Sequence, residues 1–286
     1  MVGNEHKIRA LIRLLSDNDD RIAKTISSRL IEMGDCAIPL LLEAEIEQPE
    51  MARRIEAILD EIRGTRLEDG FRELSAAADE EVDLEKGAFL LARYAFPNLD
   101  VCDYRRKIEA MASEVRDRMG RRVSGEEAVK ILNRYLFAEQ GFRGNTKNYY
   151  EADNSYLNRV IDRRTGIPIS LSTVYLLVGS RLGLPLHGVG MPGHFLVKFE
   201  SDRYKIFIDC FNGGALLTER DCARFLVQAG YGFEEKYLCK SSNRAILIRM
   251  LKNLIAIYTK LDDGLKTGRL GRFMEILGGT TRAECD

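Results

Sequence analysis

The sequence has no tryptophan, no Cys-x-x-Cys pair and no apolar run long enough to cross a bilayer. The missing tryptophan removes a common side chain for stacking on bases or sugars. The six cysteines are dispersed and none has a histidine beside it, which argues against a zinc site and against a disulfide framework. We therefore expect no metal, no other cofactor, and free thiols packed in a reducing environment.

An excess of charge of either sign is also missing. The chain has 43 Lys and Arg against 44 Asp and Glu, so its formal net charge is −1 over 286 residues. A balanced surface gives no indication of nucleic-acid binding. The start, MVGNEHKIRALIRLL, is charged throughout and has no signal-peptide core. We expect a cytoplasmic protein without a membrane segment, large enough for one large or two modest domains.

The first 64 residues have the apolar spacing of short helices in pairs. Ile8, Ile12 and Leu15 share one predicted helix face, and Gly34 ends a second helix. The pattern over residues 11–44 resembles a HEAT repeat, but about one and a half repeats are fewer than the three that a solenoid needs. The segment is either a partner-binding surface or a helical cap. Residues 65–83, charged and rich in alanine, are expected to be a linker or another helix.

The central stretch runs from Gly166 to Asp209. Residues 170–182 have helical spacing, and Pro168 stands where a missing N–H costs nothing at a helix start. Two alternating segments, 194–199 and 204–210, are expected to be strands, with Lys198 and Lys205 as solvated positions. His194 opens the first strand and Asp209 closes the second. In papain-like sites a Cys at the helix start is activated by such a His, and the acid orients the imidazole.

The segments GIPISLSTVYLLVGSRLGLP, PGHFLVKF and FIDCFNGG resemble the transglutaminase-like domain of the SirB1 family. The resemblance extends upstream through LLARYAFPNLDV, LNRYLFAEQGFRGN and NSYLNRVIDRRTG, and covers roughly residues 84–260. It implies an α+β fold of the cysteine-proteinase type, with a helix packed on a small antiparallel sheet and mostly helical extensions at both ends. The implied domain spans residues 84–242, and residues 243–286 would form a helical pair similar to a TPR remnant.

The resemblance breaks at the nucleophile. The wider transglutaminase pattern has Gly-x-Cys at the helix start, whereas this chain has Gly166–Ile167–Pro168. Ser170 is the nearest hydroxyl. It either caps the helix by bonding a backbone N–H or, if it reached His194, acts as a nucleophile. Cys210 is expected to face away from His194, because neighbours on a strand point to opposite faces.

Three polar residues around this stretch are candidates for ligand binding. Arg143 lies in a loop, residues 139–153, that is rich in Gly, Asn and Tyr, and loops of this kind often line sites. Asn154 follows that loop and Asn212 follows Asp209. Each also has a purely structural interpretation: Arg143 could hold the loop on its own domain, Asn154 could cap a helix, and Asn212 could shape the turn before Gly213.

Three functions remain open at this point. The chain is a non-catalytic peptide- or protein-binding or regulatory protein that uses the cleft around Ser170, His194 and Asp209. Alternatively, it is a hydrolase or acyl transferase in which Ser170 attacks, His194 is the base and Asp209 orients it. The third possibility is a helical-repeat interaction protein. Proline at the nucleophile position favours the first, and the oligomeric state is not predicted.

Overall fold

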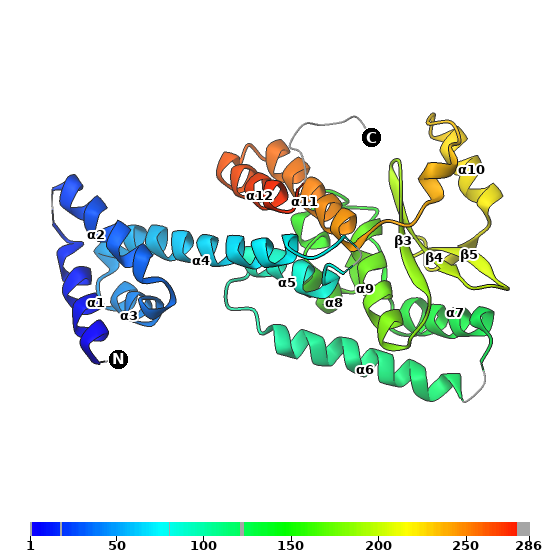
Figure 1. Cartoon of the computed structure of the whole chain (residues 1–286), viewed down its shortest axis with the longest axis horizontal. Helices are drawn as coiled ribbons and strands as arrows, with labels where there is room; N and C mark the ends of the chain where they lie inside the picture. The colour runs from blue at the N-terminus through cyan, green and yellow to red at the C-terminus, as the bar shows by residue number, and fades with distance from the viewer. Residues whose placement is uncertain (1, 18, 80, 121–122, 279–286) are drawn as a thin grey trace. The chain divides into compact units, whose positions relative to one another are not determined.

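The computed structural model describes residues 2–17, 19–79, 81–120 and 123–278, and the chain divides into two compact units, Met1–Gly70 and Phe71–Asp286 (Figure 1). Helices make up most of the secondary structure, and the two small sheets of the described residues lie in the second unit. The expected α+β class is therefore confirmed. The last residues of the predicted C-terminal pair, 279–286, lie outside the described residues.

The first unit is helical. Its elements are α1 (Val2–Leu14), α2 (Asp20–Met33), α3 (Ile38–Glu47), the 3₁₀ turns η1 (Gly34–Cys36) and η2 (Pro49–Met51), and most of α4 (Ala52–Ser75). The predicted apolar face of Ile8, Ile12 and Leu15 is buried in its core. The carboxylate of Asp19 caps α2 by accepting the N–H of Arg21, and Gly34 ends that helix at φ 60°. Residues 65–75 belong to α4, in which the division between the units falls.

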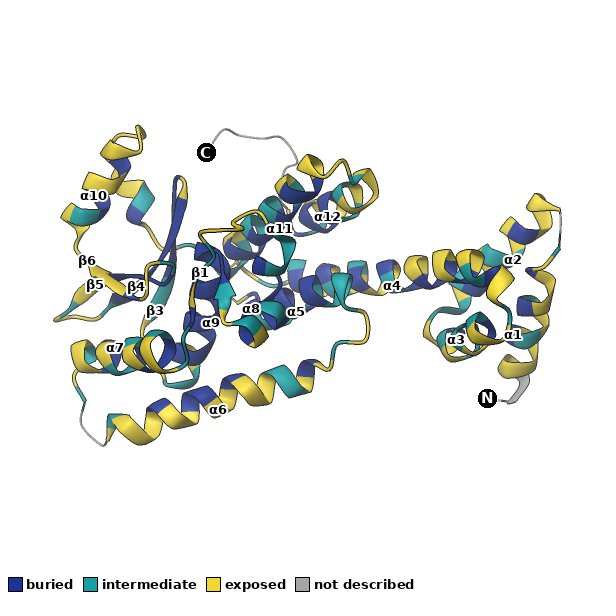
Figure 2. Ribbon diagram, turned by 180° about the vertical axis from the view of Figure 1, so that it is seen from behind, coloured by how far each residue is buried: buried dark blue, intermediate teal, exposed yellow. Residues whose placement is uncertain are grey.

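The second unit holds the remaining helices. They are α5 (Leu84–Ala95), α6 (Val101–Met119), α7 (Gly125–Asn133), the π-helix η3 (Arg134–Glu139), η4 (Ala152–Asn154), α8 (Leu157–Arg163), α9 (Pro168–Arg181), α10 (Glu219–Gln228), η5 (Glu235–Leu238), α11 (Asn243–Lys260) and α12 (Gly264–Ile276). Side chains cap several of them, among them Asp83, Asp100, Ser124 and Ser242. α9 is buried from Pro168 to Gly179, as its dark blue ribbon shows in Figure 2.

Four antiparallel strands form the main sheet in the order β3 (Leu186–Met191), β4 (His194–Glu200), β5 (Lys205–Asp209) and β6 (Ala215–Leu217). Met191 pairs with His194, so β3 and β4 join through a two-residue turn in which Gly193 has φ 69°. A second, two-stranded sheet pairs β1 (Arg143–Gly144) with β2 (Thr165–Gly166) in parallel. The sequence pattern did not predict this small sheet, because two residues are too few to show a period.

Both faces of the main sheet are covered. α9 packs against β3 and β4, while Leu196 and Phe207 on the other face contact Cys222 and Leu226 of α10. Lys198 shares that second face and is only 5% exposed; its ammonium lies 3.2 Å from the Glu200 carboxylate. The expectation of a solvated Lys198 was wrong, because α10 and η5 cover the face that the strand alternation assigned to water. α11 and α12 pack together as a helical pair.

The π-helix η3 supports the turn after β5. Its hydrogen bonding is wider than that of an α-helix, since Gln140 N–H donates to the carbonyl of Tyr135. Phe137 within it contacts the backbone of Gly214, where an added Cβ would lie 2.4 Å from the phenylalanine ring. Asn133, just before it, donates from Nδ2 to the Gly214 carbonyl at 2.7 Å. Gly214 N–H in turn donates to the carbonyl of Asp209 at 2.8 Å, so η3 holds the segment that carries Asp209.

Candidate functional site

The predicted imidazole–carboxylate pair is formed. His194 at the start of β4 and Asp209 at the end of β5 lie on the same face of the sheet, and His194 Nε2 is 2.9 Å from Asp209 Oδ2. Both residues are buried, at 8% and 5% exposure. The strand register explains this contact. Val197 pairs with Ile208, which places the start of β4 beside the end of β5.

The carboxylate of Asp209 is fixed by four hydrogen bonds. Besides His194, it accepts the backbone N–H groups of Phe211 and Asn212, each at 3.1 Å, and Asn212 Nδ2 at 2.8 Å. Burial by itself would raise the pKa of Asp209, but the hydrogen bonds from His194 and Asn212 outweigh it and lower the pKa. The acid therefore stays ionised and fixes the orientation of the imidazole.

The second ring nitrogen of His194, Nδ1, has no hydrogen-bond partner among the described residues. Aromatic rings surround the imidazole instead. The ring of Phe225 on α10 lies 5.4 Å from it, and that of Phe211 lies 6.4 Å away at a steep angle. Tyr149 packs edge-on against Phe211 at 5.9 Å. Nδ1 is thus the ring nitrogen left for a ligand.

A cavity of about 240 Å³ opens beside the imidazole. Its wall comes from Tyr149 of the loop, residues 193–195 of the β3–β4 hairpin, the first two residues of α9, and Arg249, Lys252 and Asn253 of α11. We refer to it as the His194 pocket. Two elements of the predicted site, the imidazole and the start of the central helix, therefore line the same cavity.

The start of α9 brings Pro168 to this pocket. Pro168 is the first residue of the helix and lines the cavity together with Ile169 and His194. The N-cap residue Ile167 has no side-chain oxygen, so no side chain caps the first-turn N–H groups. The position that carries a Cys in the Gly-x-Cys pattern thus lies next to the histidine, with a pyrrolidine ring in place of the thiol.

Ser170 lies apart from the pair. It is fully buried, and its hydroxyl donates to the Asn154 carbonyl at 2.6 Å and accepts the Ile167 N–H at 3.1 Å. It does not line the His194 pocket. The structure therefore joins His194 with Asp209 but does not bring Ser170 to them. Cys210 is buried on the other face, and burial raises the pKa of its thiol.

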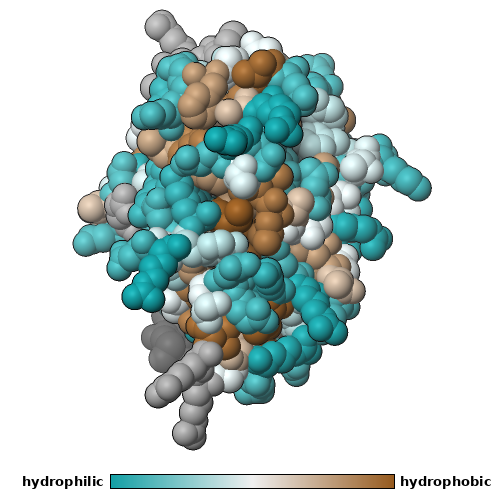
Figure 3. Space-filling model, turned by 90° about the vertical axis from the view of Figure 1, so that its right-hand side faces the viewer, coloured by the Kyte–Doolittle hydropathy of each residue, from teal (hydrophilic) through white to brown (hydrophobic). Residues whose placement is uncertain are grey.

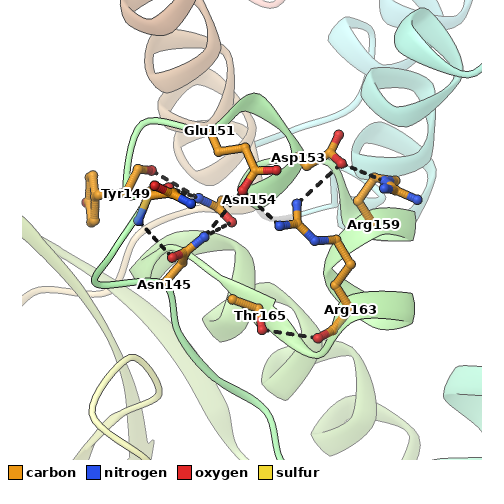
Figure 4. Close-up of polar contacts among 9 residues, drawn as sticks. Asn145, Tyr149, Glu151, Asp153, Asn154, Arg159, Arg163 and Thr165 are labelled. Atoms are coloured by element: carbon orange, nitrogen blue, oxygen red, sulfur yellow. Dashed lines mark hydrogen bonds and ion pairs between the residues drawn. The ribbon is translucent and has the colours of Figure 1, made fainter.

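Asn154 ties the preceding loop to the start of α9 (Figure 4). Its side chain is fully buried, donates to the carbonyls of Asn148 and Tyr149 at 2.7 and 3.2 Å, and accepts from Asn145 Nδ2 at 3.0 Å. Its own carbonyl accepts the Ser170 hydroxyl. Asn154 therefore positions Tyr149, which lines the pocket, and does not itself line it.

An ion-pair network continues from Asn154 towards α8 (Figure 4). The guanidinium of Arg163 lies 2.8 Å from Glu151 and 3.3 Å from Asp153, and Arg159 donates to Asp153 at 2.8 Å. These contacts close the loop onto the helix that follows it. Arg163 is thus paired with two carboxylates within the network.

The remaining predicted ligand residues lie outside the pocket wall. Arg143 is exposed, and its backbone N–H pairs with the Arg164 carbonyl beside β2. The side-chain amide of Asn212 donates to the Asp209 carboxylate and does not line the pocket. Sequence reasoning missed Arg249, Lys252 and Asn253, which form one polar stripe at i, i+3 and i+4 on α11. That spacing was the available signal, but it is also the pattern of an ordinary solvated helix face.

Several apolar residues in the segment next to this pocket are exposed. Phe225, Val227, Tyr231 and Phe233, in and after α10, are 38–61% exposed. An added Cβ on Gly193 would lie 3.6 Å from the Tyr231 ring, so this segment reaches the β3–β4 turn. Seen from the side on which α10 and the main sheet lie in Figure 1, apolar surface appears in the middle of the face among hydrophilic residues (Figure 3).

Two further properties concern the described residues as a whole. Within them, no group of three or more His, Cys, Asp and Glu side chains is placed to hold a metal ion. Likewise, none of the helices in the described parts of the chain is both long and apolar enough to span a membrane.

The fold and the site together define a class. A buried helix starts beside a histidine at the beginning of one strand, and an acid at the end of the neighbouring strand orients that histidine, as in transglutaminase-like domains. The sequence model described as "Transglutaminase-like superfamily" matches residues 102–252, more than half of the chain, and the protein belongs to this superfamily.

Relatives are found in bacteria and in animals. A UPF0162 protein of Xylella fastidiosa strain Temecula1 is 37% identical over 196 residues, which are 66% of this chain and 69% of that protein. Mouse F-box only protein 21 is 36% identical over 143 residues, 46% of this chain and 22% of that protein. A UPF0162 protein of Vibrio cholerae is 37% identical over 81 residues, 28% of this chain and 30% of that protein. No solved structure matches the chain.

Proposed function

We propose that this protein is a non-catalytic, cytoplasmic relative of the transglutaminase-like enzymes that binds a peptide or protein segment in the His194 pocket, in a regulatory role. One observation carries the proposal: Pro168 occupies the helix start beside His194. Within this proposal the closer family is that of SirB1, and the first unit is a HEAT-like helical segment that adds a surface for partners.

Proline at this place removes two functions at once. It has no thiol or hydroxyl, so it cannot attack a carbonyl carbon. It also has no N–H, so the first helical position cannot donate to a developing oxyanion as other residues at a helix start can. What stays is an oriented imidazole in a cavity, which can bind a group without forming a bond to it.

The alternative nucleophile lacks the required geometry. Ser170 has its hydroxyl hydrogen committed to the Asn154 carbonyl, and it is fully buried. A serine becomes a nucleophile when a base accepts that hydrogen. The contacts of Ser170 are those of a residue that fixes the start of α9, which supports a structural role.

The surroundings of the pocket suit a chain segment. Tyr149, Phe211 and Phe225 place rings on and near the imidazole, and aromatic residues are enriched where proteins bind proteins. Mouse F-box only protein 21 contains a matching stretch that makes up 22% of its length. There the region is one part of a longer chain, which fits a module that serves interaction.

A selection of random peptides against the full chain tests the proposal. Selected peptides should lose about tenfold or more in affinity for the Tyr149→Ala variant, because Tyr149 lines the pocket and removing an aromatic ring at the centre of a binding site costs about 2 kcal/mol or more. The matched control is Leu265→Ala, which removes a 90% exposed apolar side chain from α12. Equal affinity of the peptides for the two variants would show that they do not bind in the His194 pocket.

A chemical probe tests the absence of catalysis. A fluorophosphonate should leave the wild-type protein unlabelled, because the Ser170 hydroxyl donates to the Asn154 carbonyl and His194 pairs with Asp209 instead. Labelling that disappears in Ser170→Ala would instead establish a hydrolase and overturn the proposal.

A further inference from the structure

The charged side chains that line the His194 pocket are basic. Arg249 and Lys252 bring two cations from α11, and His194 adds an imidazole. Of the described residues that line the pocket, none is acidic. Another cavity of this unit shows the contrast, because Asp83 and Glu85 accompany Lys240 in its wall. A wall with cations and no carboxylate attracts an anion.

The two cations are held differently. Arg249 Nη2 donates to the carbonyls of Met191 and His194 at 2.8 and 3.0 Å, so its charge is fixed against the β3–β4 turn. Lys252 is half-buried and forms no ion pair with a described residue. Its three N–H donors are therefore available to a ligand, and Asn253 beside it adds an amide.

The start of α9 adds to the same field. The helix has 14 residues and its N-cap residue Ile167 has no side-chain oxygen, so the positive end of its dipole faces the pocket at Pro168 and Ile169. Next to it, His194 lines the same cavity with only 8% of its surface exposed, and its Nδ1 has no hydrogen-bond partner among the described residues. This nitrogen is therefore open to a ligand that enters the pocket.

We infer that the His194 pocket binds the carboxylate at the C-terminal end of a peptide. This inference rests on the proposed function and names the chemical group that is recognised. Lys252 and the α9 start would hold the carboxylate oxygens, and Pro168, Ile169 and Phe195 form an apolar wall for the last side chain. The size agrees: about 240 Å³ is below the roughly 300–1,000 Å³ of small-molecule pockets and suits the end of a chain.

Three pools of N-acetylated random pentapeptides test the inference on the full-length protein. The first pool has no Asp or Glu and a free C-terminal carboxylate, the second is the same pool with a C-terminal amide, and the third is amidated with one internal Glu. Immobilised wild-type protein should retain the first pool at least about tenfold over the second, the size of one charge-assisted contact. Preference for the third pool over the first would assign the carboxylate to a side chain and overturn the terminal assignment.

Variants locate the effect. Lys252→Gln and Lys252→Glu should abolish the preference for the free carboxylate. The control is Lys24→Glu on α2, outside the pocket, which changes the charge by the same amount as Lys252→Glu. This control should keep the preference for the free carboxylate. The inference is overturned if the wild-type protein retains the free-carboxylate pool and the amidated pool equally, or if it retains neither pool. The proposed function fails separately, through the Tyr149→Ala and Leu265→Ala comparison above.

Discussion

His194 and Asp209 hold one another in a fixed orientation: Nε2 of the imidazole lies 2.9 Å from Oδ2, and three more hydrogen bonds fix the carboxylate. Because Nε2 is committed to the acid, the ring can offer only Nδ1 to anything that enters the pocket. The pair is thus an oriented binding group even though the residue at the helix start cannot react.

Replacing this carboxylate should weaken the fold. Asp209→Asn keeps the size of the side chain but removes the charge that accepts four hydrogen bonds. We expect the free energy of unfolding at pH 7 to fall by about 1.5–3 kcal/mol, the range for hydrogen bonds to a charged group. Urea denaturation followed by circular dichroism measures it. Asp202→Asn, in an exposed turn, is the control and should have little effect.

The same carboxylate predicts a pH dependence. Its pKa is lower in the folded protein than in the unfolded chain, so its stabilisation is present above the unfolded value, about 3.9, and is lost as the pH falls through the folded value. The difference in urea midpoint between wild type and Asp209→Asn should therefore shrink below about pH 4. A difference that grows in acid would show that the folded pKa is raised.

Restoring a thiol at the helix start should create a reactive group. In Pro168→Cys the introduced sulfur would line the same pocket as His194, and a neighbouring imidazole lowers the pKa of a thiol. We expect alkylation by iodoacetamide at pH 6.5 to be about tenfold or more faster there than at the exposed Cys36 and Cys102, as read by peptide mass spectrometry.

The second variant for this test removes the base. Pro168→Cys combined with His194→Ala should return the alkylation rate to that of Cys36. If the single variant already reacts like Cys36, the imidazole does not face the helix start, and the architecture described here is wrong at its centre.

Asn154 offers a test of the loop anchor. Asn154→Asp replaces the amide nitrogen that donates to the carbonyls of Asn148 and Tyr149 by an oxygen, so three acceptors would face one another in a buried site. We expect a loss of about 2–4 kcal/mol in stability. Amide hydrogen exchange over residues 145–150 should become faster, whereas the same change at the exposed Asn98 should leave it unaltered.

Two glycines provide a matched pair. An added Cβ at Gly144 would lie 2.6 Å from the Phe211 ring and 2.7 Å from its carbonyl oxygen, so Gly144→Ala should cost about 1–3 kcal/mol and displace the ring next to His194. At Gly268, exposed in α12, nothing lies within 4 Å. Gly268→Ala should stabilise by about 0.5–1 kcal/mol, because alanine is the better helix residue. Thermal denaturation of both variants gives the comparison.

Much of the fold could be predicted because its signals are local. The spacing of apolar residues in α9 and the alternation in β4 and β5 each depend on neighbours in sequence. The alternation assigned a face to His194 within β4 and to Asp209 within β5, and the strand register then places the two residues on one face of the sheet. Lys198 shows the limit, since its burial depends on α10, a helix whose docking no strand pattern reveals.

The pocket itself was less accessible to sequence reasoning. Its cations come from α11, more than 50 residues after His194, and a polar stripe on a helix is ordinarily turned to water. The roles of Asn154 and Asn212 also depended on partners in space. Both residues were candidates for ligand binding, yet they hold Tyr149 and Asp209, because their amides meet backbone or carboxylate groups brought there by the fold.

The π-helix η3 makes the site sensitive to the length of the chain. A π-turn holds one residue more than an α-turn, so deleting one residue between 134 and 139 would return this segment to α-helical bonding and change the direction in which its side chains point. Phe137 would turn away from Gly214, and the segment behind Asp209 would lose its support. A homologue that is one residue shorter here therefore needs a different contact to hold the acid that orients its imidazole.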